Sequence, residues 1–197
     1  MKGIIFSALM VRALLAGNKT QTRRPIIPQP TFINGNGWWQ NHPFGRETTM
    51  GMLEHGPFRP GDVLYVKETW VSFTSDGEKG YLYKADPAFD NYEPRDSGWK
   101  WRSPTFMPQS AARIFLKVTN VTAEKLWDIR EADAIAEGIQ HKCGDCTECE
   151  GESAGNDCTD YRLAFSKLWD SIYAKKPEYQ WDKNPYVWVI SFERTSA

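Results

Sequence analysis

Outside one short segment the chain has no cysteine. All four cysteines fall within residues 143–158, and histidine occurs only three times in 197 residues. Disulfide scaffolds need cysteines in several segments, so this distribution excludes a disulfide framework along the chain. A metal site built on sulfur would have to lie within that one segment.

The chain also lacks a long apolar run. Its first residues, "MKGIIFSALMVRALLAG", are interrupted by Arg12, and no run approaches the roughly 18 apolar residues of a membrane-spanning helix. We therefore expect no signal peptide and no membrane partner, and we predict a cytoplasmic protein.

An excess of one charge is missing as well. Lys and Arg number 24 and Asp and Glu 25, which gives a net charge of −1. This balance argues against a protein that coats nucleic acid over its whole surface. However, the first 24 residues contain five basic side chains and no acidic one, whereas acids dominate residues 131–160. The basic N-terminal part can still face a nucleotide or a polyanion.

The patterns that are present predict one α+β domain over residues 1–197, and they leave the oligomeric state open. Strand-like stretches are "GIIFSA", "RPGDVLYVKETW", "GYLYKA", "RIFLKVTNV" and "NPYVWVISFER". Helical spacing occurs in "ALMVRALLAG", "TAEKLWDIREADAIAEGI" and "DYRLAFSKLWDSIYA". This order favours a mainly antiparallel, closed sheet. Residues 25–60, rich in Pro, Gly, Asn and aromatics, predict a long loop that is either functional or partly mobile.

The segment "AGNKTQTRR", residues 16–24, is the first candidate site, and we expect it to form a loop after a helix. Lys19 and Thr22 are three residues apart, so a tight turn would bring both into one cleft. A desolvated lysine can take the proton that a threonine hydroxyl loses when it acts as a nucleophile. The alternative is that Lys19, Arg23 and Arg24 only solvate the helix end. Spacing alone favours that alternative.

Two glutamates are further candidates. Glu68 alternates with Leu64 on an otherwise apolar strand face, so it should be buried with a cationic partner, for which Arg23 and Arg24 are natural candidates. It either contacts a substrate or forms an ion pair that orients the loop. Glu137, in "AIAEG", reads by itself as a solvated glutamate at a helix end.

The cysteines form a C-x2-C-x2-C-x8-C pattern in an insertion at about residues 141–160: Cys143, Cys146, Cys149 and Cys158. Four thiolates at this spacing suit a tetrahedral zinc site, which would be structural because no coordination position stays open. An iron–sulfur cluster and free thiols in an acidic loop are the alternatives. His141 is the one spare ligand.

Tryptophans occur in segments without periodicity: Trp38, Trp39, Trp99 and Trp101. Stacking on a nucleobase is the functional interpretation, with Trp39 as the candidate substrate-binding residue. Packing of loops against the core is the alternative.

Together these stretches resemble the ASCH domain of the PUA-like superfamily. "LLAGNKTQTRR" is similar to its helix followed by G-x-K-T-x-T-x-R, "RPGDVLYVKETW" to its turn and strand, and "AIAEGI" to its A-x-x-E-G helix. "FSKLWDSIY" and "NPYVWVISFE" are similar to the last helix and strand of longer phage- and prophage-type members. The resemblance implies a small β-barrel flanked by helices, with a cleft suited to RNA or a nucleoside.

The resemblance also implies an activity. Some small bacterial members are amidohydrolases that remove the acetyl group of N(4)-acetylcytidine without a cofactor. If the roles of the matching family residues apply here, Lys19 would activate Thr22 as the nucleophile, and Glu137 would act as acid or base. Arg23, or backbone amides, would stabilise the oxyanion.

In this interpretation four residues would bind the substrate, namely Arg23, Arg24, Glu68 and Trp39. The 25–60 loop and the cysteine insertion are additions to the small enzymes, and either could reshape the cleft. Three alternatives remain: a non-catalytic module that binds RNA or a modified base, a ribonuclease, and a phage accessory protein that acts through its acidic cysteine loop.

Overall fold

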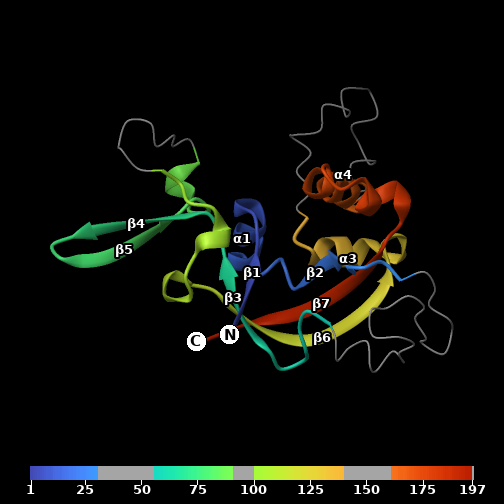
Figure 1. Ribbon diagram of the computed structural model, residues 1–197, viewed down its shortest axis with the longest axis horizontal. Helices are drawn as coiled ribbons and strands as arrows, with labels where there is room; N and C mark the ends of the chain where they lie inside the picture. The colour runs from blue at the N-terminus through green and yellow to red at the C-terminus, as the bar shows by residue number, and fades with distance from the viewer. Residues whose placement is uncertain (31–55, 91–99, 140–160, 197) are drawn as a thin grey trace.

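The computed structural model describes residues 1–30, 56–90, 100–139 and 161–196 (Figure 1). Its strands are β1 (Lys2–Ile5), β2 (Gln21–Pro25), β3 (Val63–Lys67), β4 (Trp70–Ser75), β5 (Glu78–Tyr83), β6 (Phe115–Lys125) and β7 (Tyr186–Thr195). Its α-helices are α1 (Ala8–Leu15), α3 (Glu131–Ala136) and α4 (Tyr161–Tyr173). The α+β class is confirmed. No helix in these ranges is long and apolar enough to cross a membrane.

Five strands form one curved sheet in the order β1-β3-β6-β7-β2. β1 runs parallel to β3, and the other neighbours are antiparallel, as predicted. The prediction of a closed sheet is wrong: β1 and β2 are the two edges, and within the described ranges no strand pairing joins them.

The outer edge of β2 is blocked by its own side chains. Thr20 O and Ile26 N bond to β7, so antiparallel alternation turns the backbone of the odd-numbered residues of β2 away from β7. On that outer side, Lys19 Nζ occupies Gln21 O, and Arg24 Nη1 occupies Arg23 O. Pro25 has no N–H to offer. These contacts occupy acceptors that a further strand such as β1 would need.

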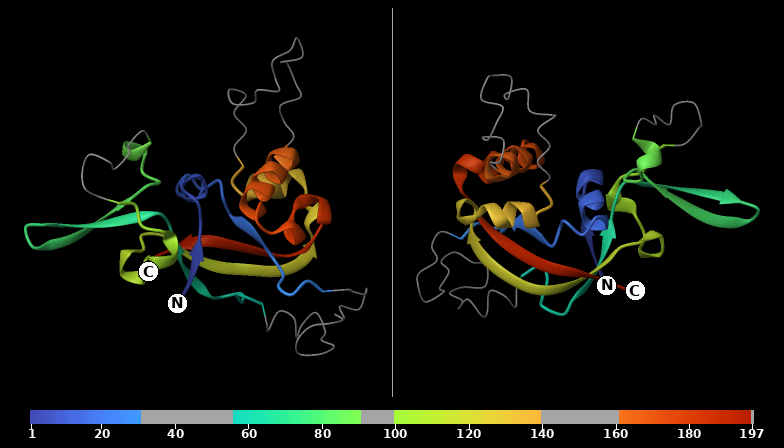
Figure 2. Two further views of the ribbon diagram at one scale, coloured as in Figure 1. Left: turned by 45° about the horizontal axis from the view of Figure 1, so that its top comes forward. Right: turned by 180° about the vertical axis from the view of Figure 1, so that it is seen from behind.

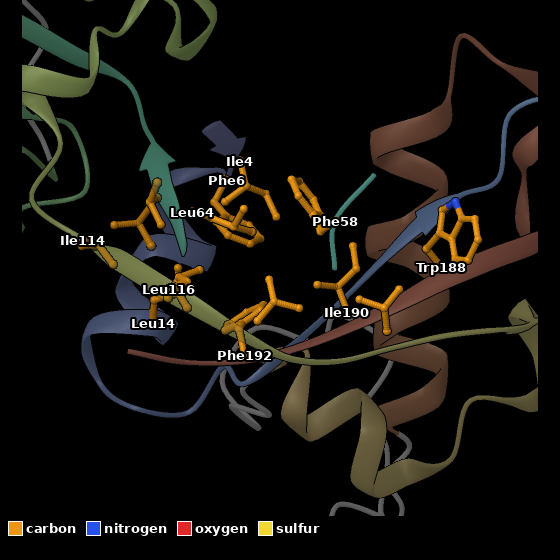
Figure 3. Packing of buried hydrophobic residues seen from close by; sticks show 14 of the residues in the cluster. Ile4, Phe6, Leu14, Phe58, Leu64, Ile114, Leu116, Trp188, Ile190 and Phe192 are labelled. Atoms are coloured by element: carbon orange, nitrogen blue, oxygen red, sulfur yellow. The ribbon is translucent and has the colours of Figure 1, made fainter. Parts of the chain in front are cut away.

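The largest apolar core lies inside the curve of the sheet, beneath α1 (Figure 3). Leu64 and Val66 of β3 are buried at every second residue, which confirms the alternation predicted for this strand. Val11 and Leu14 of α1 are fully buried against them, and Phe6 packs on Phe192 of β7.

A second core lies between the sheet and the pair α3 and α4, which Figure 2 shows stacked over β7. Phe165 and Trp169 of α4 are buried there with Val187 and Val189. The helix expected from the spacing of this segment is confirmed, and Ile172 near its end is 57% exposed.

The β4–β5 hairpin projects from the body (Figure 1). Its turn places Asp76 and Gly77 at φ 53° and 83°, as a type I′ turn requires. The Phe73 ring lies over Gly80, where a Cβ atom would come within 2.2 Å of the ring. Trp70 and Tyr81 pack against each other nearer the base.

Two local predictions were wrong for the same reason. Residues 122–125 were expected to begin a helix, but they end β6, where Thr122 pairs with Val189 and Lys125 with Tyr186. Residues 21–24 were expected to be loop, but they belong to β2 and pair with β7. In both segments pairing with the distant strand β7 overrides the local pattern.

Candidate functional site

The turn after α1 is joined to the end of α3 and thereby positions Lys19. Thr20 N donates to Ala136 O, and Lys19 and Glu137 form an antiparallel β-bridge. Gly138 follows with φ 87°, and a Cβ atom there would lie 2.8 Å from Ala13 Cβ and 3.0 Å from Lys19 Cβ. Only glycine fits at this close approach.

Lys19 and Glu137 form a buried ion pair. The two residues are 3% and 4% exposed. Lys19 Nζ donates to Glu137 Oε2 at 2.9 Å, Glu137 O at 2.6 Å and Gln21 O at 2.8 Å. Burial lowers the pKa of Lys19 from 10.5, and the Glu137 carboxylate only partly opposes this. The prediction of a solvated Glu137 at a helix end is wrong.

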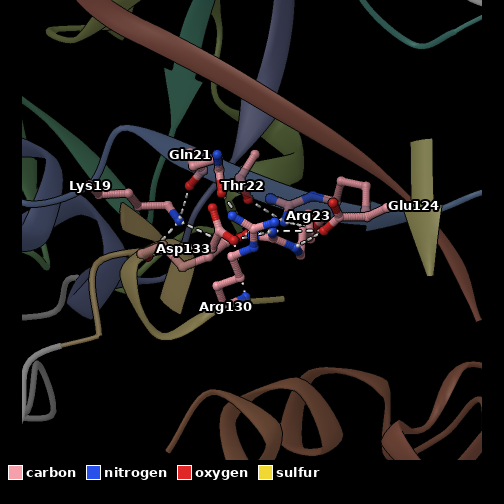
Figure 4. A network of polar contacts seen from close by, with 9 residues as sticks. Lys19, Gln21, Thr22, Arg23, Glu124, Arg130 and Asp133 are labelled. Atoms are coloured by element: carbon pink, nitrogen blue, oxygen red, sulfur yellow. Dashed lines mark hydrogen bonds and ion pairs between the residues drawn. The ribbon is translucent and has the colours of Figure 1, made fainter. Parts of the chain in front are cut away.

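Arg23 leaves β2 on the face turned to α3 and makes four hydrogen bonds to side-chain acceptors there (Figure 4). It donates to Glu124 Oε1 at 3.0 and 2.8 Å, Gln21 Oε1 at 2.8 Å and Glu137 Oε1 at 3.3 Å. Asp133 lies 3.7 Å away. The Arg23 side chain is 1% exposed. Arg23 is therefore too enclosed to contact a substrate, and its bond to Glu137 Oε1 holds that carboxylate in place.

Thr22 and Arg24 leave β2 on the opposite face. Arg24 Nη1 donates to Thr22 Oγ1 at 2.9 Å, and Arg24 Nη2 donates to Ile5 O of β1 at 3.0 Å. Arg24 and Lys19 approach the same Phe6 ring, at 5.4 and 5.3 Å from its centroid. Thr22 is 1% exposed. Among the described contacts none joins Lys19 Nζ to Thr22 Oγ1.

A hollow of about 480 Å³ adjoins Arg24 between the two edge strands. It is lined by Gly3, Ile4, Ile5, Arg24, Pro25, Ile27, Pro57, Phe58 and Trp188. Figure 3 shows Ile4, Phe58 and Trp188 among the core side chains on this side of the sheet. The hollow reaches Arg24 on this face of β2, and Thr22 is not among its lining residues.

Tyr173 of α4 is a residue that sequence reasoning missed. Its ring packs on Trp169, with centroids 4.6 Å apart. Burial raises the pKa of Tyr173 from 10.0, while the charge of Arg24 lowers it and that of Glu137 raises it. Its position four residues after Trp169, on the same apolar stripe, was the available signal.

Glu68 belongs to a different network from Lys19. Arg113 holds its carboxylate with two bonds of 2.9 Å, so the prediction that Arg23 or Arg24 pairs with it is wrong. Arg113 also bonds to Asp86 and lies 4.0 Å from the Tyr83 ring centroid. Burial raises the pKa of Glu68 from 4.5, and Arg113 opposes this. This pair supports the base of the β4–β5 hairpin.

The four cysteines, His141, Trp38, Trp39 and Trp99 lie outside the described residues. Within those residues no group of three or more His, Cys, Asp or Glu could hold a metal ion. Trp101 is described and packs edge-on against Phe89, at 5.4 Å between centroids. Zinc therefore stays a prediction.

Comparisons of the chain with protein-family models, with curated proteins and with solved structures gave no match. Function is therefore inferred from the geometry around Lys19, Thr22, Arg24 and Glu137.

Proposed function

We propose that this chain is an ASCH-type amidohydrolase that cleaves the exocyclic amide of N(4)-acetylcytidine or of a related modified base, free or in RNA. The observation that carries the proposal is the buried Lys19–Glu137 pair, at 2.9 Å, beside the strand that bears Thr22. Burying an ion pair is costly, and perturbed lysines concentrate at functional sites.

In the proposed reaction Thr22 Oγ1 attacks the amide carbonyl carbon. The neutral form of Lys19 accepts the hydroxyl proton, and the lowered pKa of Lys19 makes that form more abundant at a given pH. Lys19 Nζ already bonds to the carbonyl of Gln21, the residue before Thr22. In the proposed reaction Lys19 Nζ would leave this carbonyl and come within hydrogen-bond distance of the Thr22 hydroxyl.

Arg24, rather than Arg23, would stabilise the developing oxyanion. In the tetrahedral intermediate the oxyanion and Thr22 Oγ1 are bound to the same carbon, so the two oxygens are neighbours. Arg24 Nη1 donates to Thr22 Oγ1 at 2.9 Å and is therefore within reach of that position.

Glu137 would hold the Lys19 ammonium formed in the first step. The proton then passes from Lys19 to the leaving amine nitrogen as the carbon–nitrogen bond breaks, which releases cytidine and leaves acetyl-Thr22. Water attacks the ester carbonyl, Lys19 takes its proton and returns it to Thr22 Oγ1, and acetate leaves. No metal or cofactor takes part in this scheme.

The test is incubation of the purified protein with N(4)-acetylcytidine while cytidine and acetate are quantified. We expect both products in equal amounts, with turnover lost in Thr22→Ala. Thr20→Ala is the matched control, because Thr20 is exposed two residues away. Absence of turnover in the unmodified chain, or full turnover in Thr22→Ala, would contradict the proposal.

A second candidate is a non-catalytic module that binds RNA or a modified base. The observation in its favour is that all three protons of the Lys19 ammonium have acceptors while Thr22 is 1% exposed. A salt-dependent affinity for RNA that survives both Lys19→Ala and Thr22→Ala, in the absence of turnover, would favour this candidate.

A further inference from the structure

Arg24 differs from the other inward-facing cations in its partners. Lys19, Arg23 and Arg113 each contact at least one carboxylate. In the part of the chain that the structure describes, the acceptors of Arg24 are three uncharged oxygens: Thr22 Oγ1, Arg23 O and Ile5 O. Its positive charge has no counterion there.

The hydrogen-bonding capacity of Arg24 is also incompletely used. A guanidinium has five N–H donors, and three of the Arg24 donors have acceptors among the described residues. The other two N–H groups of this half-buried side chain have no acceptor among the described residues. A partly desolvated guanidinium is stabilised most by an anionic acceptor, which supplies charge as well as hydrogen bonds.

The hollow beside Arg24 has the size and lining of a small-molecule site. Its volume of about 480 Å³ lies in the range of ligand pockets. Apart from Arg24, its lining residues are apolar or are glycine and proline, and they include the rings of Phe58 and Trp188. Such walls suit a flat ring or a short apolar chain.

We propose that the hollow between β1 and β2 binds a small organic anion, with Arg24 pairing the anionic group and the attached ring packing against the apolar walls. The anionic group is a carboxylate or a phosphate, both of which match the guanidinium geometry. Binding here does not require hydrolysis, so the site exists whether or not the chain turns over an amide.

The direct test compares two probes that differ in charge but hardly in shape, benzoate and benzamide, by isothermal titration calorimetry of the full chain. We expect benzoate to bind at least roughly tenfold more tightly, as the gain from a charge-assisted hydrogen bond implies. Arg24→Gln should abolish this preference, and Arg24→Lys should retain part of it. Equal binding of the two probes, or a preference that survives in Arg24→Gln, would overturn the proposal.

A second pair of variants keeps the test valid if Arg24→Gln is poorly folded. Ile5 lines the hollow and is 45% exposed, whereas Leu9 of α1 is 67% exposed and is absent from the lining. Ile5→Glu places a carboxylate beside Arg24 and should weaken benzoate binding at least roughly tenfold by competing for the cation. Leu9→Glu makes the same change in net charge and should leave binding unaltered. Equal effects of the two variants would contradict the site.

Phenyl phosphate, and cytidine 5′-monophosphate beside cytidine, distinguish the sources of the anion. Tighter binding of the nucleotide than of both phenyl phosphate and cytidine would assign the site to a nucleotide, and tightest binding of benzoate would assign it to a carboxylate. Inorganic phosphate that competes as well as phenyl phosphate would contradict a role for the apolar walls. Because these are equilibrium measurements, they stand apart from any failure to hydrolyse N(4)-acetylcytidine.

Discussion

Arg24 Nη1 donates a hydrogen bond of 2.9 Å to Thr22 Oγ1. Both side chains leave β2 on one face, and Arg23 leaves on the other, where Glu124 and Glu137 bind it. Strand alternation thus gives two adjacent arginines different environments. Arg23 is enclosed by carboxylates, whereas Arg24 faces a hydroxyl and a hollow.

The first prediction concerns the Thr22 hydroxyl. Thr22→Ala should lower kcat/KM for N(4)-acetylcytidine by at least roughly a thousandfold, because no other group would form the acyl intermediate. Thr22→Ser keeps a hydroxyl at the same place and should retain measurable turnover. A Thr22→Ala enzyme as active as Thr22→Ser would exclude Thr22 as the nucleophile.

The second prediction concerns the pH dependence of the proposed reaction. Burial lowers the pKa of Lys19 from 10.5, so its neutral, basic form is populated at lower pH than in an exposed lysine. The value of kcat/KM should therefore rise with pH and level off below pH 10.5. Lys19→Met should remove both the activity and this dependence. A profile that still rises above pH 10.5 would argue against a Lys19 base with a lowered pKa.

The third prediction concerns stability. Arg23→Gln removes the cation shared by Glu124 and Glu137, and should lower the free energy of unfolding by about 3 kcal/mol, the scale for breaking a buried ion pair. Arg194→Gln is the control, because that side chain makes one exposed bond to Leu15 O. It should change stability by less than about 0.5 kcal/mol. Equal free energies of unfolding for the two variants in urea denaturation would contradict a stabilising role of Arg23 between Glu124 and Glu137.

The fourth prediction concerns Glu68, whose pKa is raised from 4.5 by burial. The folded state then holds the Glu68 proton more tightly than the unfolded state does. The stabilisation from this group is fully present below pH 4.5 and is lost as pH rises through the raised pKa. Glu68→Gln cannot titrate, so the stability of the unmodified chain relative to this variant should fall over that interval.

Urea denaturation across this pH range measures the difference. Glu193→Gln is the control, because the Glu193 side chain is 60% exposed and should leave the pH dependence unchanged. If the unmodified chain instead became more stable relative to Glu68→Gln as pH rises, the assigned direction of the Glu68 pKa would be reversed.

Local patterns predicted the elements whose burial follows a simple period. The alternation of β3 and the helical stripe of α4 could be read from the sequence, because each element packs on a core with one face. The end of β6 and the whole of β2 could not, because their strand conformation comes from pairing with β7, whose residues lie far along the chain.

The partners of the candidate-site residues could not be predicted from the sequence. Glu137 has no local signal of burial, since its partner Lys19 is 118 residues away in sequence. Arg113 was missed as the partner of Glu68 because it stands 45 residues away, just before β6. Which of the two arginines Arg23 and Arg24 faces the α3 carboxylates depends on the strand conformation of β2, which the sequence did not indicate.

The most direct measurement of the central claim is to trap the acyl intermediate. The chain is mixed with excess N(4)-acetylcytidine and quenched in acid within the first turnover, and the products are analysed by peptide mass spectrometry. The proposed mechanism predicts one acetyl group on the peptide that contains Thr22, located on the Thr22 oxygen and absent from Thr22→Ala. Cytidine release without any acetylated peptide, or acetylation that persists in Thr22→Ala, would contradict it.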